Sequence, residues 1–330
     1  MRTRYLIVFA TMALFLIDRF KLILGLQGLS IFLSRNFIMC FPRIYFVFPI
    51  CLLIISDRCY LAGLITEAKF FIIYAFSFFS GLSFALIIFS KPMLQAQIFI
   101  TFFFALVGFG RLFDIDMAPT IEILELVHNW AEIMFFMLIA RLYLVGGAYT
   151  HSHQYLLIFF SILSGSKFLF LNQIVMATVK RYYAPVILGI VIFSLIINPL
   201  GKLDTRLSLY GLFFNNINWG NFVFNKIPSV NDLVYLETTI YSFHSIWLDY
   251  LWLGGGFGIL TILVHGWILV TAYSREKSQL NKSIIIMYLI CVTFGFSLFF
   301  GTKYMMLMLG ILVFRMEISN MSLNWKSEQK

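Results

Sequence analysis

Long apolar runs separated by short polar turns make up most of this chain. The runs occupy residues 5–17, 22–34, 38–56, 61–89, 93–110, 126–147, 154–166, 168–179, 183–199, 246–271, 284–300 and 303–318. A helix needs roughly 20 apolar residues to cross a bilayer, and the shorter runs fit half-spans or tilted pairs. We therefore expect an all-α integral membrane fold, a polytopic helical bundle of about 10–12 transmembrane helices. Residues 1–330 would form a single transmembrane domain.

The composition also indicates a membrane environment. Of the 330 residues, 61% are hydrophobic, 18% are aromatic and only 12% are charged, which is more apolar surface than a soluble domain can bury. The net charge of +9 lies mainly in short loops, as the positive-inside rule requires, so we expect no nucleic-acid partner. The cysteines lack metal or redox spacing and are expected to act as small packing residues: Cys40, Cys51, Cys59 and Cys291.

The lysine and arginine residues orient the bundle. Those on one side, which we expect to be cytoplasmic, are Arg2, Arg4, Arg35, Lys91, Lys180, Arg181, Arg275, Lys277, Lys282, Lys326 and Lys330. The opposite side receives Asp114, Asp116 and the loop 200–245. Both termini are then cytoplasmic, and 200–245 is a large periplasmic loop. The first run has basic flanks but no small-residue cleavage site, so we expect a retained helix.

The loop 200–245 is the sizeable polar stretch of the chain. It is rich in asparagine, and its interleaved aromatic residues argue against disorder, so we expect amphipathic pieces on the outer membrane surface. Arg206 stands near the start of this loop. His244 stands at its end, where it opens an apolar helix and shares one helical face with Trp247. Taken alone, Arg206 could equally anchor a lipid headgroup, and His244 could cap an interfacial helix.

A second polar element is the turn 164–167, Ser-Gly-Ser-Lys, between two apolar runs. It should lie on the outer side, where Lys167 runs against the positive-inside tendency. Two explanations stay open. Lys167 could bind an anionic ligand such as a pyrophosphate, or its side chain could reach a lipid phosphate.

These elements, in this order, resemble the O-antigen polymerase and ligase family of polytopic bacterial sugar transferases. That family has a Ser-Arg turn, an outer loop opening with arginine and an aromatic residue, and a histidine helix followed by two glycines. The matching positions, within about 150–260, are Ser166, Lys167, Arg206, Tyr210, Trp219, Gly220, Asn221, His244, Trp247, Leu248, Gly255 and Gly258. The chain departs from the family's pattern at three positions. Lys167 replaces arginine and loses bidentate phosphate recognition, Ser245 replaces asparagine, and Leu253 replaces a common acidic residue.

The resemblance implies an inner-membrane glycosyltransferase of polysaccharide and lipopolysaccharide biosynthesis, with a periplasmic site. Its donor would be a glycan on undecaprenyl pyrophosphate, and other partners would be membrane lipids and a chain-length regulator. Arg206 and Lys167 would hold the pyrophosphate leaving group, and His244 would take the acceptor proton or orient the acceptor. Tyr210, Trp219 and Trp247 would line the acceptor cavity. The implied reaction uses no metal and no cofactor. An O-antigen polymerase is favoured, and the alternative within the family is a ligase that transfers the glycan to the lipid A core.

A competing group of ionisable residues lies at the start of the run 126–147. Glu125, His128 and Glu132 share one helical face there. They could form the polar path of a lipid-linked oligosaccharide flippase, hold a metal, or be a polar first turn at the outer interface. Glu125 and His128 could also line the same external cavity as the loop.

The remaining histidines are expected to be structural. His151 and His153 fall in an inside loop and are expected to be solvated. His265 lies in the middle of a predicted helix, where a hydrogen bond to a neighbouring helix is the expected role.

Overall fold

The computed structural model describes residues 28–29, 31–32, 35–61, 69–88, 135, 138–140, 142–144, 151–164, 201–216, 234–235, 238–239, 243, 245–294 and 305–317. Nearly all of these residues are helical, which confirms the all-α expectation. The named helices are α3 (Arg35–Ile38), α4 (Ile44–Leu61), α5 (Lys69–Ile88), α8 (His151–Ser164), α11 (Gly201–Asn216), α13 (Ile246–Gly254), α14 (Gly256–Arg275) and α15 (Gln279–Phe294). A further helix spans 305–317, and helical pieces occur between 135 and 144. A small antiparallel hairpin pairs β1 (Val234–Tyr235) with β2 (Thr238–Thr239).

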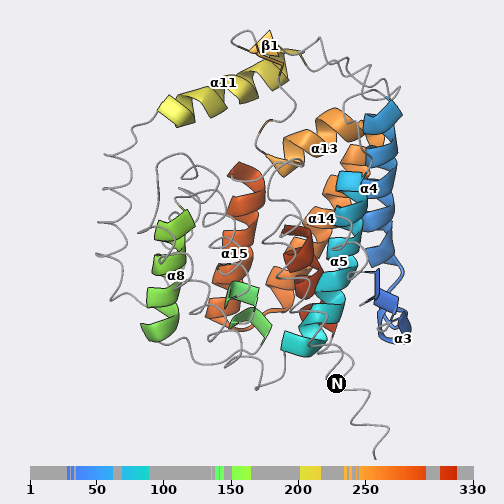
Figure 1. The fold of residues 1–330 in the computed structure, drawn as a ribbon, viewed down its shortest axis with the longest axis vertical. Coiled ribbons are helices and arrows are strands. Elements are labelled where there is room, and N and C mark those ends of the chain that lie inside the picture. Colours follow the sequence, from blue (N-terminus) through green and yellow to red (C-terminus); the bar gives the residue numbers. More distant parts are fainter. Residues whose placement is uncertain are drawn as a thin grey trace, which may run out of the picture.

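The long helices form a bundle with α11 lying across one end. Figure 1 shows α4, α5, α14 and α15 along the long axis, while α11 lies across the upper end of the view and α3 lies toward the opposite end. Aromatic side chains fill the space between the long helices. The buried Phe48 ring of α4 lies 5.4 Å from Phe78 of α5 and 6.5 Å from Tyr250 of α13, centroid to centroid.

The predicted span 38–56 differs from the observed helix. The chain turns at Phe41 and Pro42, and α4 begins at Ile44 and continues to Leu61. The reason is that the proline ring disfavours helical backbone in the residue before it. The predicted run over 38–56 therefore combined the end of α3 with most of α4.

The single helix expected over 246–271 is wrong, because the structure breaks it at Gly255. This residue has φ 53° and ψ −126°, a conformation that side-chain-bearing residues rarely adopt. The two parts pack closely at the bend, where a Cβ on Gly258 would lie within 3 Å of the backbone oxygen of Tyr250. The bend separates α13 from α14 and allows α13 to tilt across the end of the bundle (Figure 1).

Helix α5 and the helix 305–317 cross at a pair of glycines. The Cα atom of Gly310 lies close enough to Gly81 that a Cβ on Gly81 would approach it to 3.0 Å. The added Cβ would also come within 2.1 Å of the backbone oxygen of Leu307. Glycine at both positions lets the two backbones touch, as at close helix crossings in membranes.

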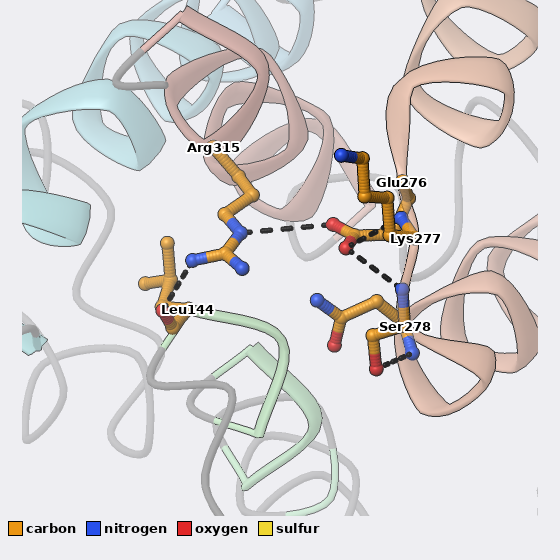
Figure 2. Close-up of polar contacts among 6 residues, drawn as sticks. Leu144, Glu276, Lys277, Ser278 and Arg315 are labelled. Atoms are coloured by element: carbon orange, nitrogen blue, oxygen red, sulfur yellow. Dashed lines mark hydrogen bonds and ion pairs between the residues drawn. The ribbon is translucent and has the colours of Figure 1, made fainter. Parts of the chain in front are cut away.

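Charged side chains gather at the end of the bundle away from α11. Glu317 accepts a hydrogen bond from the hydroxyl of Tyr45 at 2.6 Å and pairs with Arg275 at 3.3 Å. Nearby, Arg315 Nε lies 3.6 Å from Oε2 of Glu276, and its Nη1 donates to the backbone oxygen of Leu144 at 3.0 Å (Figure 2). These contacts join α4, α14, the helix 305–317 and the segment that ends at 144.

Among the described residues, one helix is long and apolar enough by itself to cross a bilayer. This helix is α14, Gly256–Arg275. The polytopic arrangement expected from the sequence thus stays a prediction.

Candidate functional site

Helix α13 begins two residues after His244, the residue for which the resemblance implies a catalytic role. His244 lies outside the described residues, but both of its neighbours, Phe243 and Ser245, are described. Ser245 has extended backbone (φ −141°, ψ 119°) and caps the amino end of α13. The apolar run predicted from 246 does start there, but the expectation that His244 itself opens the helix and shares a helical face with Trp247 is wrong, because Ser245 is still extended.

A buried aspartate, Asp249, bonds both neighbours of His244, one through its carboxylate and the other through its backbone N–H. Asp249 Oδ1 accepts a hydrogen bond from the backbone N–H of Phe243 at 2.9 Å. The backbone N–H of Asp249 donates to the oxygen of Ser245, also at 2.9 Å. The Asp249 side chain is only 1% exposed and lies in the first turn of α13, where the helix dipole favours a negative charge.

Helix α11 packs on this same segment through aromatic rings. The Phe213 ring of α11 meets the Phe243 ring edge to face, with centroids 5.0 Å apart. The Trp252 ring of α13 lies 5.6 Å from Phe243 and completes the group. Leu209, Phe213 and Phe243 form a small buried cluster separate from the main core. We call this contact the α11–α13 joint.

Arg206 belongs to α11, although its side chain is outside the described part of the structure. It precedes Leu209, Tyr210 and Phe213 by three, four and seven residues. Residues at these spacings share one helical face. Position 206 therefore lies on the face that α11 turns toward the bundle, one turn before the joint.

Two predicted cavity residues, Tyr210 and Trp247, meet at Thr293 near the end of α15. The indole Nε1 of Trp247 donates to Thr293 Oγ1 at 2.9 Å, and the hydroxyl of Tyr210 donates to the Thr293 backbone oxygen at 3.4 Å. The Thr293 hydroxyl in turn donates to the backbone oxygen of Leu289 at 2.7 Å. Thr293 thus connects α11, α13 and α15 at one point.

A polar group lies in the core beside Trp247. The fully buried imidazole of His265 contacts the Trp247 ring in a tilted arrangement, with centroids 4.7 Å apart, and its Nε2 is 2.9 Å from the hydroxyl of Tyr288 in α15. The Tyr288 hydroxyl donates to the backbone oxygen of Met305 at 3.2 Å, so its oxygen is left to accept from His265. This favours the tautomer with the proton on Nε2, with the Tyr250 hydroxyl 3.5 Å from Nδ1. The expected hydrogen bond from His265 to a neighbouring helix is confirmed.

Several predicted site residues cannot be placed against this geometry. Lys167, Trp219, Glu125 and His128, like His244, lie outside the described residues.

His151 and His153, expected in a loop, instead occupy the first turn of α8. Within the described parts of the chain, no group of three or more histidine, cysteine or acidic side chains is arranged to hold a metal ion.

Sequence reasoning missed Asp249 and Thr293. Asp249 carries one available signal, since an acidic residue inside an otherwise apolar helix requires a hydrogen-bonding partner. Thr293 carries none, because threonine is common in apolar helices and its two partners lie 46 and 83 residues away in the chain.

Comparison with known proteins finds no similar one: no family model matches the chain, and no curated protein or solved structure resembles it detectably.

Proposed function

We propose that this chain is a multi-pass protein of the bacterial inner membrane. Support comes from the outward face of α14, where Leu263, Trp267 and Val270 are 63%, 42% and 69% exposed. A continuous apolar face of this kind is costly in water and favourable in lipid. Basic residues also lie at and just after the end of α14, away from α11. Arg275 and Lys277 lie at one end of the bundle, and α11 lies flat across the other (Figure 1), as expected for a helix at a membrane surface.

Within that setting we propose a glycosyltransferase that joins undecaprenyl-pyrophosphate-linked oligosaccharide repeats at the periplasmic face, an O-antigen polymerase. The α11–α13 joint carries this proposal, because it brings the helix that contains Arg206 onto the segment that contains His244. Two distant parts of the chain, each assigned a role by the resemblance, come together at one end of the bundle.

The proposed chemistry follows from the charges that develop during transfer. A hydroxyl oxygen of the acceptor sugar attacks the anomeric carbon of the donor glycan, and the bond from that carbon to the phosphate oxygen breaks. Arg206 and Lys167 stabilise the negative charge that gathers on the departing undecaprenyl pyrophosphate. His244 takes the proton of the attacking hydroxyl, for which an ordinary imidazole pKa near neutrality is suited.

The test is to express the chain and its variants in a bacterial strain whose polysaccharide depends on it. His244→Ala and Arg206→Ala should each abolish the ladder of long chains on a gel while single lipid-linked repeats accumulate in the outer leaflet. His153→Ala and Lys277→Ala are the matched controls, since both lie outside the joint, and should leave the ladder unchanged. A normal ladder in both site variants would refute the proposal.

Two other functions make different predictions in the same experiment. A ligase would leave lipid-linked polymer intact in the variants but stop its transfer to the lipid A core. A flippase is the candidate from another class, and the buried polar group of His265, Tyr250 and Tyr288 is the observation that favours it. In that case the lipid-linked repeats would accumulate on the cytoplasmic leaflet.

A further inference from the structure

The backbone N–H of Phe243 is satisfied by a side chain rather than by a helix or a sheet. We propose that Asp249 is a positioning residue whose carboxylate clamps the backbone directly before His244, at Phe243, and so restrains where that histidine can lie. The consequence for catalysis rests on the proposed function. The clamp itself is a property of the fold and can be tested separately.

The geometry of the clamp involves both neighbours of His244. The carboxylate of Asp249 accepts from Phe243, and the backbone N–H of Asp249 donates to Ser245, each at 2.9 Å. The carboxylate of Asp249 therefore restrains the residue before position 244, while the first backbone hydrogen bond of α13 restrains the residue after it. All three are almost fully buried, with exposures of 1% for Phe243, 3% for Ser245 and 1% for Asp249.

Burial is what makes the restraint strong. Water cannot easily replace a lost partner at this depth, so an unpaired Phe243 N–H would bear its full desolvation cost. A hydrogen bond to an ionised carboxylate is roughly twice as strong as one between neutral groups. The amino end of α13 also favours the negative charge.

The clamp is mechanically coupled to α11. The Phe243 ring, on the residue whose N–H the carboxylate holds, is also the ring that Phe213 of α11 contacts at 5.0 Å. If the backbone at 243 moves, both the histidine after it and the contact with the Arg206 helix must shift. Asp249 thus sets the relative position of the two predicted catalytic stretches without touching substrate.

The direct test is hydrogen–deuterium exchange at the Phe243 amide, measured by mass spectrometry on the full chain in detergent. Asp249→Asn keeps an oxygen acceptor, so protection at Phe243 should stay within about threefold of wild type. Asp249→Ala removes the acceptor, and exchange at Phe243 should become about tenfold faster or more. Thr261→Val is the matched control, because the buried Thr261 donates a hydrogen bond to the backbone oxygen of Phe257 in α14, outside the clamp.

Activity in cells gives the second readout. Asp249→Asn should retain the ladder of chain lengths, and Asp249→Ala should lose it as fully as His244→Ala. The proposal is overturned if Asp249→Ala leaves the Phe243 amide protected, or if Asp249→Asn loses the ladder while that amide stays protected. The second result would mean that the charge, not the clamp, is what matters.

Two further outcomes are also decisive. Exchange across α14 shows whether Asp249→Ala folds. If it does not, Asp249→Asn decides alone: a protected Phe243 amide together with a retained ladder supports the clamp. Loss of protection at Phe243 while α14 stays protected overturns it. Should the wild-type chain make no polysaccharide while the exchange pattern is as expected, the clamp stands and the proposed function fails.

Discussion

The crossing of α5 with the helix 305–317 gives a quantitative prediction for Gly310→Ala. A Cβ at 310 would lie 2.1 Å from the backbone oxygen of Phe78 and 3.0 Å from the Cα of Gly81. Ordinary contact begins near 3.4 Å, so the backbones must separate by about 1.3 Å, the difference between the first distance and that limit. Because both obstacles are backbone atoms, rotation of a side chain cannot relieve the clash.

The energetic cost follows from what surrounds the crossing. Phe78, Leu82 and Phe314 are fully buried there, and a gap of this size removes about half or more of the dispersion attraction between facing atoms. Overpacking of a core costs about 1–3 kcal/mol. The better helix propensity of alanine returns up to about 1 kcal/mol. We therefore expect a net destabilisation of about 1–2 kcal/mol.

The assay is thermal unfolding in detergent, followed by intrinsic tryptophan fluorescence. At about 2–4 °C for each kcal/mol, Gly310→Ala should lower the midpoint by about 2–8 °C. Gly266→Ala is the matched control, because it makes the same chemical change in α14 where a Cβ meets nothing within 4 Å. It should leave the midpoint unchanged or raise it slightly. Equal shifts for the two variants would refute the close crossing.

The remaining predictions use the same unfolding assay. Gly255→Ala places a side chain at φ 53° and ψ −126° and should cost about 1–3 kcal/mol, and a midpoint equal to wild type would contradict the bend between α13 and α14. Tyr288→Phe leaves His265 Nε2 and the Met305 oxygen without their buried partner and should destabilise the fold by about 1–3 kcal/mol. The control is Tyr273→Phe, at a half-exposed ring that lies under Lys282, which should have little effect. Similar shifts for the two tyrosine variants would count against the His265 network.

The sequence predicts the helical elements of this protein well where their chemistry is local. The apolar run 61–89 carries Glu67 and Lys69 near its polar start, which narrows the predicted membrane part to 69–89 and matches α5 to within a residue. The loop 200–245 was expected to contain amphipathic pieces, and α11 is a helix whose buried Leu209 and Phe213 lie on one face. In both cases the signal lies within a few residues of the element that it predicts.

The features that the sequence did not predict depend on distant parts of the chain. Four glycines lie between 254 and 258, and packing of the folded bundle determines that Gly255 is the one with positive φ. Tyr45 and Glu317 are 272 residues apart in the chain and 2.6 Å apart in space. The candidate site shows both cases. The start of α13 was predicted, but Asp249, the partner of Phe243, and Thr293, the partner of Tyr210 and Trp247, were not.

The proposed membrane setting gives a reason for an acidic residue inside α13. Phe243 precedes the helix, so its backbone N–H has no partner among the helical backbone oxygens. In a bilayer such backbone is tolerated only where protein or a water-filled cavity satisfies it. Phe243 is buried, and the carboxylate of Asp249 accepts its N–H. Under the proposed function His244 follows directly on this irregular backbone, and the buried carboxylate of Asp249 stabilises that backbone close to the apolar layer.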